Sequence, residues 1–374
     1  MVNNKKIIFL YNSASYLYHF RISLMLAMKK RGWQVIALSP YDECAKKIQE
    51  NGITYFDFRF KRKGRNPLSD LWMLIRLVKF YNQEKPKIVH HFTIKPVIYG
   101  TLAARICRIH GIVNLVPGLG FVFSQGGILQ QIVEKMYRFS FSSRVRVIFQ
   151  NRNDLNFFVK TKLVNRKQTH LICGSGVNIK LYSLNNYPQD NFPREIIFTL
   201  IARMLWDKGI SEFVKAAKIV NEKNPHTRFW LIGDPDRGNP SSIPLSWLKN
   251  LKSLDYIKWI EHKDDIKPYI AKSSVIVLPS YREGAPRSLI EAASMSKPII
   301  AADVPGCREI VKNKVNGLLV SKKNAALLSQ AMLTLADNPS QRKKMGYASR
   351  KIALKSFDER LIIRKTIKIY RELS

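Results

Sequence analysis

The chain has 374 residues, 46% of them hydrophobic, and carries 63 Lys and Arg against 27 Asp and Glu, a formal net charge of +36. This length exceeds one ordinary hydrophobic core and predicts two domains, while the apolar fraction excludes a disordered chain. The charge predicts an anionic partner, either nucleic acid or the anionic lipids of a cytoplasmic leaflet. An AT-rich genome would explain some of the lysines but not the shortage of acids.

The cysteines and the apolar runs indicate the setting of the chain. The four cysteines are scattered without the spacing of a metal site, so we expect reduced thiols and no bound metal: Cys44, Cys107, Cys173 and Cys307. We find no leader pattern at residues 1–11 and no apolar run of the ~18 residues that would span a bilayer. We therefore expect a cytoplasmic protein that is at most peripheral on the inner face of the cell membrane.

Strand-like and helix-like stretches alternate along the whole chain, which predicts an α/β architecture with parallel sheets. Residues 6–11 and 34–38 read as strands on either side of a helix, a Rossmann-like unit whose ligand lies at the carboxyl ends of the strands. The loop between them lacks a glycine-rich phosphate motif. Its candidates for a polar ligand are Ser15, Tyr16, His19 and Arg21. For His19 and Arg21, a solvated position in the first turn of the helix is an equal alternative.

Three further features follow in the first half of the chain. Residues 59–65 form a basic loop, read either as plainly exposed or as a contact for lipid headgroups or a diphosphate. A strand at residues 87–91 ends in His90 and His91, with Lys95 in the loop beyond. Each histidine is either a binder of a polar group or, as is more common, a satisfied residue of the core. Residues 126–146 place apolar side chains at helical spacing beside four basic ones. Such a helix most commonly packs into a core, and the more specific alternative is a helix that lies on a membrane surface.

The second half opens with a strand at residues 196–201, whose exit carries Arg203 and Lys208. Two fixed cations here would stabilise negative charge that develops on a leaving phosphate. Salt bridges to nearby acids are the alternative interpretation. The next strand, residues 227–232, runs into a loop with Asp234, which could face a nucleobase or a sugar.

The most informative stretch is Pro279–Ala292, which follows a buried strand at residues 274–278. Pro286 is placed at the start of a helix, so the backbone N–H groups of the next three residues are expected to form an anion site: Arg287, Ser288 and Leu289. Two acids bracket the turn. Glu283 in the loop could reach a bound sugar, and Glu291 in the helix could accept hydrogen bonds from another pair of hydroxyls.

Glu283 and Glu291, with the Lys297-Pro-Ile-Ile strand after them, resemble the Glu-x7-Glu motif of the retaining nucleotide-sugar glycosyltransferases of family 4. Residues 91–96 (His-Phe-Thr-Ile-Lys-Pro) and 174–178 (Gly-Ser-Gly-Val-Asn) are similar to further segments of that family. The resemblance covers nearly the whole chain. It is greatest to bacterial enzymes that add a sugar to a polyprenyl-diphosphate-linked saccharide, including those of N-glycan, capsule and O-antigen assembly.

The resemblance implies a GT-B fold, in which two Rossmann-like domains with parallel sheets face an interdomain cleft. We expect residues 1–178 to bind the acceptor and residues 179–355 to bind the nucleotide sugar. Residues 356–374 are expected to form a helix that crosses back onto the first domain.

The resemblance also implies roles for the candidate residues. On the donor side, Arg203 and Lys208 would hold the diphosphate, Glu283 the sugar and Glu291 the ribose. The remaining donor contacts would be Asp234 and the helix start at Arg287, Ser288 and Leu289. On the acceptor side, Lys95 would bind the diphosphate and His91 would lie near the reaction centre, with Ser15, Tyr16, His19 and Arg21 as further contacts. The expected catalytic group is Glu283, Arg203, Lys208 and His91.

The expected reaction moves a hexose or N-acetylhexosamine from a UDP-sugar to a polyprenyl-diphosphate-linked saccharide with retention of configuration. The UDP-sugar is a co-substrate, and no other cofactor or metal is expected. The expected partners are the nucleotide sugar, the lipid-linked saccharide and an anionic membrane surface. Two alternatives remain: a GT-B enzyme acting on a soluble acceptor, and a basic nucleic-acid-binding protein, for which the chain shows no helix-turn-helix or stacking motif.

Overall fold

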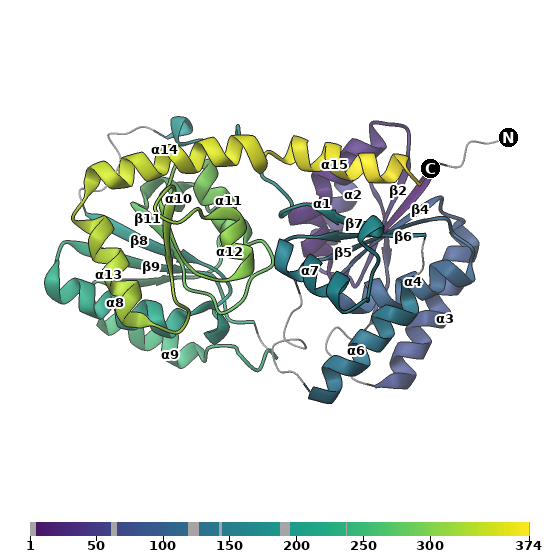
Figure 1. The fold of residues 1–374 in the computed structure, drawn as a ribbon, viewed down its shortest axis with the longest axis horizontal. Coiled ribbons are helices and arrows are strands. Elements are labelled where there is room, and N and C mark those ends of the chain that lie inside the picture. The colour runs from purple at the N-terminus through teal and green to yellow at the C-terminus, as the bar shows by residue number, and fades with distance from the viewer. Residues whose placement is uncertain are drawn as a thin grey trace. The chain divides into compact units, whose positions relative to one another are not determined.

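A computed structural model describes residues 5–60, 66–118, 127–141, 144–187, 195–236 and 238–373, without the side chain of Leu129. It divides into two compact units, Met1–Ser175 with Arg360–Ser374, and Gly176–Glu359. Each unit is a parallel sheet covered by helices (Figure 1). Residues 61–65 of the predicted basic loop lie outside the described residues.

The first unit contains a seven-stranded parallel sheet in the order β3-β2-β1-β4-β5-β6-β7. Its strands are β1 (Lys6–Leu10), β2 (Gln34–Ser39), β3 (Thr54–Asp57), β4 (Ile88–Phe92), β5 (Gly111–Val116), β6 (Val145–Phe149) and β7 (Thr169–Leu171). β1, β4, β5 and β6 are almost wholly buried, as expected for strands covered on both faces.

Helices cover both faces of this sheet. One apolar cluster joins the sheet to α3 (Pro67–Glu84), α4 (Ile94–Ile106), α6 (Gly127–Ser140) and α7 (Arg152–Lys160). The other cluster includes α1 (Ala14–Lys29), α2 (Cys44–Glu50) and α15 (Glu359–Arg371). The C-terminal helix is therefore part of the first unit, where the Tyr370 hydroxyl lies 2.6 Å from His90 Nδ1.

The second unit contains a six-stranded parallel sheet in the order β10-β9-β8-β11-β12-β13. Its strands are β8 (Ile196–Ile201), β9 (Thr227–Ile232), β10 (Ile257–Ile260), β11 (Val275–Leu278), β12 (Ile299–Ala302) and β13 (Gly317–Val320). Its helices are α8 (Ile210–Lys223), α9 (Leu245–Asn250), α10 (Lys267–Lys272), α11 (Arg287–Ser294), α12 (Pro305–Ile310), α13 (Ala325–Ala336) and α14 (Pro339–Ser356).

Local sequence explains where the decisive helices begin. The apolar spacing of residues 71–81 predicts a helix, and α3 starts four residues earlier, at Pro67. It does so because proline is tolerated in a first turn and because the Asn66 side chain accepts a hydrogen bond from the Leu68 N–H. Asn324 and Asn338 cap α13 and α14 in the same way. Within the part of the chain that the structure describes, no helix is both long enough and apolar enough to cross a bilayer.

Both sheets change direction at one point, and this positions the polar loops. In the first sheet β1 lies between β2 and β4, and in the second β8 lies between β9 and β11. Crossovers leave such neighbouring strands to opposite faces, so their exit loops separate and leave room for a ligand at the carboxyl edge. The loops after β1, β4, β8 and β11, together with the helices that follow them, carry most of the predicted site residues.

Candidate active site

The pair Lys208 and Glu283 lies at the point where the second sheet changes direction. Lys208 ends the turn after β8, and Glu283 lies in the loop after the adjacent strand β11. The Lys208 Nζ atom donates to Glu283 Oε1 at 2.5 Å, and both side chains are largely shielded from solvent. Two residues 75 positions apart in the chain thus form one charged pair at this edge of the sheet.

Glycines let the backbone of this site pack closely. Gly209 adopts φ +74°, and a Cβ atom there would lie 2.3 Å from the Pro279 carbonyl oxygen at the end of β11. A Cβ on Gly306 would lie 2.5 Å from the carbonyl oxygens of Glu283 and Gly284. Any larger residue would push the Glu283 loop out of place, so these glycines fix its position.

Arg203 belongs to the same edge of the sheet but lies more in the solvent. Its guanidinium donates to Asp236 Oδ2 at 2.6 Å, and its side chain is 45% exposed. The Asp234 carbonyl accepts a hydrogen bond from Met204 N–H, and its carboxylate accepts one from His262 N–H at 2.9 Å. The loop after β9 thus packs beside Arg203, and Asp236 is a residue that the sequence analysis missed.

Glu291 is nearly buried inside α11, where Arg287 Nε donates to its Oε1 atom at 2.8 Å. Burial alone would lower the pKa of Arg287, but the charge of Glu291 and the contact with Tyr182 more than offset it, so that pKa is raised. Burial, followed by the charge of Glu291, raises the pKa of Tyr182. Tyr182, which no sequence motif singled out, therefore belongs to the surroundings of Glu291.

The start of α11 differs from the expectation in one detail. Pro286 precedes the helix as its N-cap instead of occupying its first turn. The Leu289 N–H donates to the Pro286 carbonyl at 3.2 Å. Contrary to the prediction, this N–H is therefore not open to an anion. Ser288, half-buried in the first turn, still lies at the positive end of the helix.

On the first sheet, Lys95 lies in the first turn of α4, directly after β4. Its Nζ atom donates to Asp70 Oδ1 at 2.5 Å, and the Tyr99 hydroxyl donates to Asp70 Oδ2 at 3.0 Å. Asp70 belongs to α3 and was not a sequence candidate. Asp70 fixes the ammonium group of Lys95. Among the basic residues predicted to bind the acceptor, Lys95 is the one whose charged end lies near the carboxyl edge of this sheet.

Thr93, in the same loop, has an unusual backbone conformation. It adopts φ +69°, which is unusual for a β-branched residue, and its buried hydroxyl has no hydrogen-bond partner among the described residues. Such strain costs on the order of 1–3 kcal/mol and gathers at active sites and ligand clamps. The strained turn lies between His91 and Lys95, in the motif that suggested acceptor binding.

The histidines of β4 do not face a ligand. His91 is fully buried, with Nε2 3.0 Å from the Tyr81 hydroxyl and Nδ1 2.8 Å from Asn114 Oδ1. Burial lowers its pKa to about 4. His90 is buried on the opposite face of the sheet, against Tyr370. Because both ring nitrogens of His91 are engaged in the core, this geometry contradicts its predicted place among the catalytic residues and indicates a structural role.

The loop after β1 is held by Asp42, which accepts hydrogen bonds from the Ser13 hydroxyl and the Ser15 N–H at 2.8 and 2.9 Å. Ser15 and Tyr16 lie in the first turn of α1 at the carboxyl edge, where the prediction requires them. The Tyr16 ring is stacked on Tyr11.

The two basic candidates of α1 have partners within the protein. His19 Nε2 lies 3.8 Å from Cys44 Sγ. Arg21 is 6% exposed, with its guanidinium 4.9 Å from the centre of the Phe92 ring. Arg21 is thus neither a solvated first-turn residue nor open to a ligand, because it is packed into the core.

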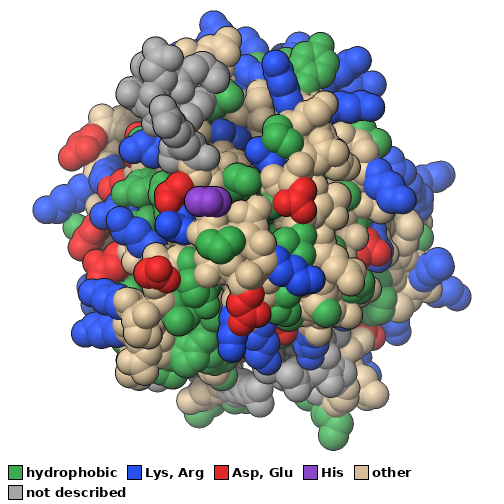
Figure 2. All heavy atoms as spheres, turned by 90° about the vertical axis from the view of Figure 1, so that its left-hand side faces the viewer, with side chains coloured by type: hydrophobic (Ala, Val, Ile, Leu, Met, Phe, Trp, Pro, Cys, Tyr) green, Lys and Arg blue, Asp and Glu red, His purple; other side chains and the backbone are tan. Residues whose placement is uncertain are grey.

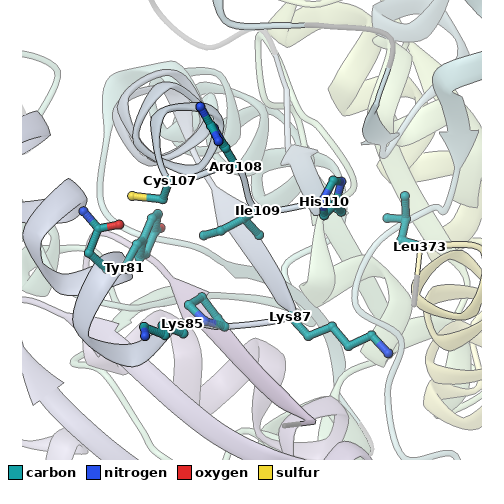
Figure 3. Close-up of a pocket in the computed structure, with 10 residues that line it drawn as sticks. Tyr81, Lys85, Lys87, Cys107, Arg108, Ile109, His110 and Leu373 are labelled. Carbon is teal, nitrogen blue, oxygen red and sulfur yellow. The ribbon is translucent and has the colours of Figure 1, made fainter. Parts of the chain in front are cut away.

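A pocket of about 370 Å³ lies at the opposite, amino edge of the first sheet. Figure 3 shows it between the ends of α3 and α4, with Lys85, Lys87, Arg108 and His110 around it. Lys85 and Arg108 follow helix C-termini, whose partial negative charge favours cations. None of the predicted site residues lines this pocket, so it is separate from the candidate active site.

Comparisons with known proteins agree with this arrangement. A model of the family described as "Glycosyl transferases group 1" matches residues 186–352, and one described as "Glycosyl transferase 4-like" matches residues 6–151. Together they span both units and both sets of loops. This chain is a GT-B glycosyltransferase. The expected family, fold and class of enzyme are thereby confirmed, and the alternative of a nucleic-acid-binding protein is not.

Relatives of this glycosyltransferase act in bacterial glycan assembly. It is 29% identical over 97% of both chains to the N,N'-diacetylbacillosaminyl-diphospho-undecaprenol alpha-1,3-N-acetylgalactosaminyltransferase of Campylobacter jejuni. It is 26% identical over 72% of both chains to the UDP-Gal:alpha-D-GlcNAc-diphosphoundecaprenol alpha-1,3-galactosyltransferase of Escherichia coli. The structure of Anabaena HepE in complex with UDP matches with a TM-score of 0.80 at 18% identity, covering 98% of this chain and 100% of that one.

Proposed function

We propose that this glycosyltransferase transfers a hexose or N-acetylhexosamine from a UDP-sugar to a polyprenyl-diphosphate-linked saccharide, with retention of configuration, in cell-surface glycan assembly. The proposal that a UDP-sugar is the donor rests on the Lys208–Glu283 pair at the carboxyl edge of the second sheet. The relatives from C. jejuni and E. coli, whose names specify diphosphoundecaprenol-linked acceptors, support the acceptor half.

The donor chemistry follows from the charges at this edge. The bond between the sugar C1 and the diphosphate oxygen breaks, and negative charge grows on the departing phosphate. Lys208 and Arg203 are each held by a carboxylate, so both cations are already in place before that charge develops. The acceptor hydroxyl forms the new bond to C1 and gives its proton to a phosphate oxygen. Glu283 holds the sugar and Glu291 the ribose.

The acceptor chemistry rests on Lys95. A lysine ammonium binds a diphosphate as a point charge, and Asp70 keeps this ammonium at the exit of β4. The strained turn at Thr93 supports a ligand-binding role for this loop. Ser15 and Tyr16 face the same edge from the neighbouring strand β1.

We further propose that the enzyme works in the cytoplasm, on the anionic inner face of the cell membrane. A polyprenyl chain keeps its diphosphate at the bilayer surface, so the enzyme would meet its acceptor at that surface. The net charge of +36 favours this approach. Figure 2 shows Lys and Arg spread among fewer acids over one face of the molecule.

The test is release of UDP and GDP from a panel of nucleotide sugars, with and without a polyprenyl-diphosphate saccharide. We expect acceptor-dependent release of UDP from one sugar, and an NMR spectrum of the product that shows the anomeric configuration of the donor retained. Release only with soluble sugar acceptors would overturn the lipid-linked acceptor. An inverted product would overturn the retaining mechanism, and GDP release would overturn the choice of UDP.

A further inference from the structure

Helix α3 exposes an apolar stripe that the core does not use. Four large side chains at positions i, i+3, i+4 and i+7 lie in solvent: Leu68, Leu71, Trp72 and Ile75, between 50% and 76% exposed. The opposite side of the helix packs into the core through Met73, Leu77 and Tyr81. A surface helix of a globular protein normally presents polar residues outward, so the outer stripe of α3 points to a partner.

Helix α6 repeats the pattern. Ile128, Ile132 and Phe139 are 77%, 48% and 71% exposed, whereas Val133 and Tyr137 are buried on its inner side. α3 and α6 both contact α4 in the same helical layer over the first sheet (Figure 1). Their seven exposed apolar residues, here called the α3–α6 face, therefore lie on one side of the unit. Large apolar side chains exposed together on one side of a unit mark an interaction site.

The charges around the α3–α6 face select the kind of partner. Lys79 continues the outer stripe of α3 by one turn, and Lys135 and Arg138 lie on the outer side of α6. Among the described residues of the two helices, no Asp or Glu is exposed. Asp70 and Glu134 are half-buried and hydrogen-bonded to Lys95 and Gln130. The partner is thus both apolar and anionic.

An anionic bilayer has both properties. Helices that lie in its interface bury Trp and Leu on one side and keep Lys and Arg towards the lipid headgroups. A second copy of this chain fits less well, because it would bring the same basic surface and a net charge of +36 against the first.

Helix α3 also connects this face to the acceptor site. Asp70, which holds the Lys95 ammonium at 2.5 Å, is followed directly in the chain by Leu71 and Trp72. The turn of α3 that carries two of the exposed apolar side chains therefore also fixes the predicted diphosphate-binding lysine. A membrane in contact with this turn would present its headgroup layer close to Lys95.

We propose that the α3–α6 face docks on an anionic membrane surface, with Leu68, Leu71, Trp72 and Ile75 buried among the lipids. This contact sets Lys95 at the depth at which a lipid-linked diphosphate lies. The docking itself stands on the exposed side chains and their charges, and only its benefit for the acceptor rests on the proposed function.

The first experiment measures co-sedimentation of the full-length enzyme with phosphatidylcholine vesicles, with and without phosphatidylglycerol. We expect the double substitution Leu71→Ser with Trp72→Ser to weaken binding to the anionic vesicles at least tenfold. The matched control is Tyr347→Ser with Leu354→Ser, which removes two exposed apolar side chains from α14, a helix with more Lys and Arg than α3 or α6, and should bind as the unchanged protein does. Lys79→Gln and Lys135→Gln should each weaken binding roughly fivefold, and less so at high salt.

A second readout reports on insertion directly. The emission of Trp72 should shift to the blue on anionic vesicles, and Trp72→Phe should bind normally and lose that shift. Equal vesicle binding by the Leu71/Trp72 variant, with normal thermal unfolding, would overturn the proposal. So would a change from dimer to monomer in analytical ultracentrifugation with vesicle binding unchanged, because the face would then join two copies.

The assay of transfer separates this proposal from the proposed function. The Leu71/Trp72 variant should turn over a short-chain, water-soluble prenyl-diphosphate acceptor normally and a long-chain acceptor in vesicles at least tenfold more slowly. Equal rates on the long-chain acceptor would overturn the link between docking and catalysis. If the unchanged enzyme uses neither acceptor while the variant still loses vesicle binding, the acceptor assignment fails and the docking surface stands.

Discussion

The carboxyl edges of the two sheets are built alike and use their polar residues differently. At the second sheet, Lys208 and Arg203 extend from loops and meet carboxylates at the surface of the edge. At the first sheet, His90 and His91 are part of β4 itself and point into the core on either side. Polar residues at the end of a strand therefore lie at the edge of the sheet when they come after the last residue of the strand, and in the core when they belong to the strand itself.

The electrostatics of the two edges differ accordingly. The edge of the second sheet, where we propose that the donor binds, holds two cations that are each paired with a carboxylate. The acceptor edge keeps one cation near the surface, Lys95, while Arg21 lies over the Phe92 ring in the interior. We therefore expect substitutions at the donor edge to act on the chemical step, and substitutions at the acceptor edge to act on acceptor binding or on stability.

The largest effect is expected from Lys208→Ala or Glu283→Ala. Either change removes a fixed group beside the departing phosphate and should lower kcat about 10²-fold or more. Steady-state assays with saturating donor measure this, with Lys344→Ala, an exposed lysine of α14, as the control. Unchanged turnover in a folded variant would contradict the assignment of Lys208 and Glu283 to the donor site.

Arg203→Ala should lower kcat/KM for the donor roughly tenfold, less than Lys208→Ala, because a half-exposed cation acts through hydrated surroundings. Asp236→Asn tests the same pair from the other side. It leaves the Arg203 charge in place and should keep most of the activity. An equal loss in both variants would mean that Asp236 itself has a role in the reaction.

Lys95→Ala should raise the KM for a diphosphate-linked acceptor about tenfold and change kcat little, because it removes one charge-assisted contact. Tyr99→Phe is the control: it removes the neighbouring hydrogen bond to Asp70 and keeps the ammonium. A fall in kcat alone, with KM unaltered, would argue against diphosphate binding by Lys95.

The smallest effect on turnover is expected at His91, whose contribution is to stability. Its pKa is about 4 in the folded protein and about 6.5 when unfolded. Between these values only the unfolded chain takes up the proton, so stability is fully present above about pH 6.5 and falls as the pH drops towards 4, by on the order of 3 kcal/mol. His91→Gln should flatten this dependence in urea unfolding and leave kcat near that of the unchanged enzyme. A large loss of kcat at unchanged stability would restore a catalytic role for His91.

The sequence by itself determined the enzyme class and the two-unit α/β architecture, and it named the residues that we propose for the donor edge. These properties follow from local pattern: buried β-branched strands, helix starts at Pro or Asn, and the spacing of Glu283 and Glu291 in one continuous segment. Lys208 could also be placed from its motif, because the loops after two adjacent parallel strands must lie side by side.

Only the tertiary structure decided which polar residues lie inside. Whether His91 and Arg21 face a ligand depends on the face of the sheet or helix that each side chain occupies, and on what packs there. Asp70 comes from a segment without a motif, and Asp236 and Tyr182 lie just beyond Asp234 and the 174–178 segment. Packing sets what each of them contacts, so no local pattern could reveal them as partners. The outer stripe of α3 was hidden for the same reason. In the sequence its apolar residues look like core, and only the packing of Met73, Leu77 and Tyr81 shows which side of the helix remains exposed.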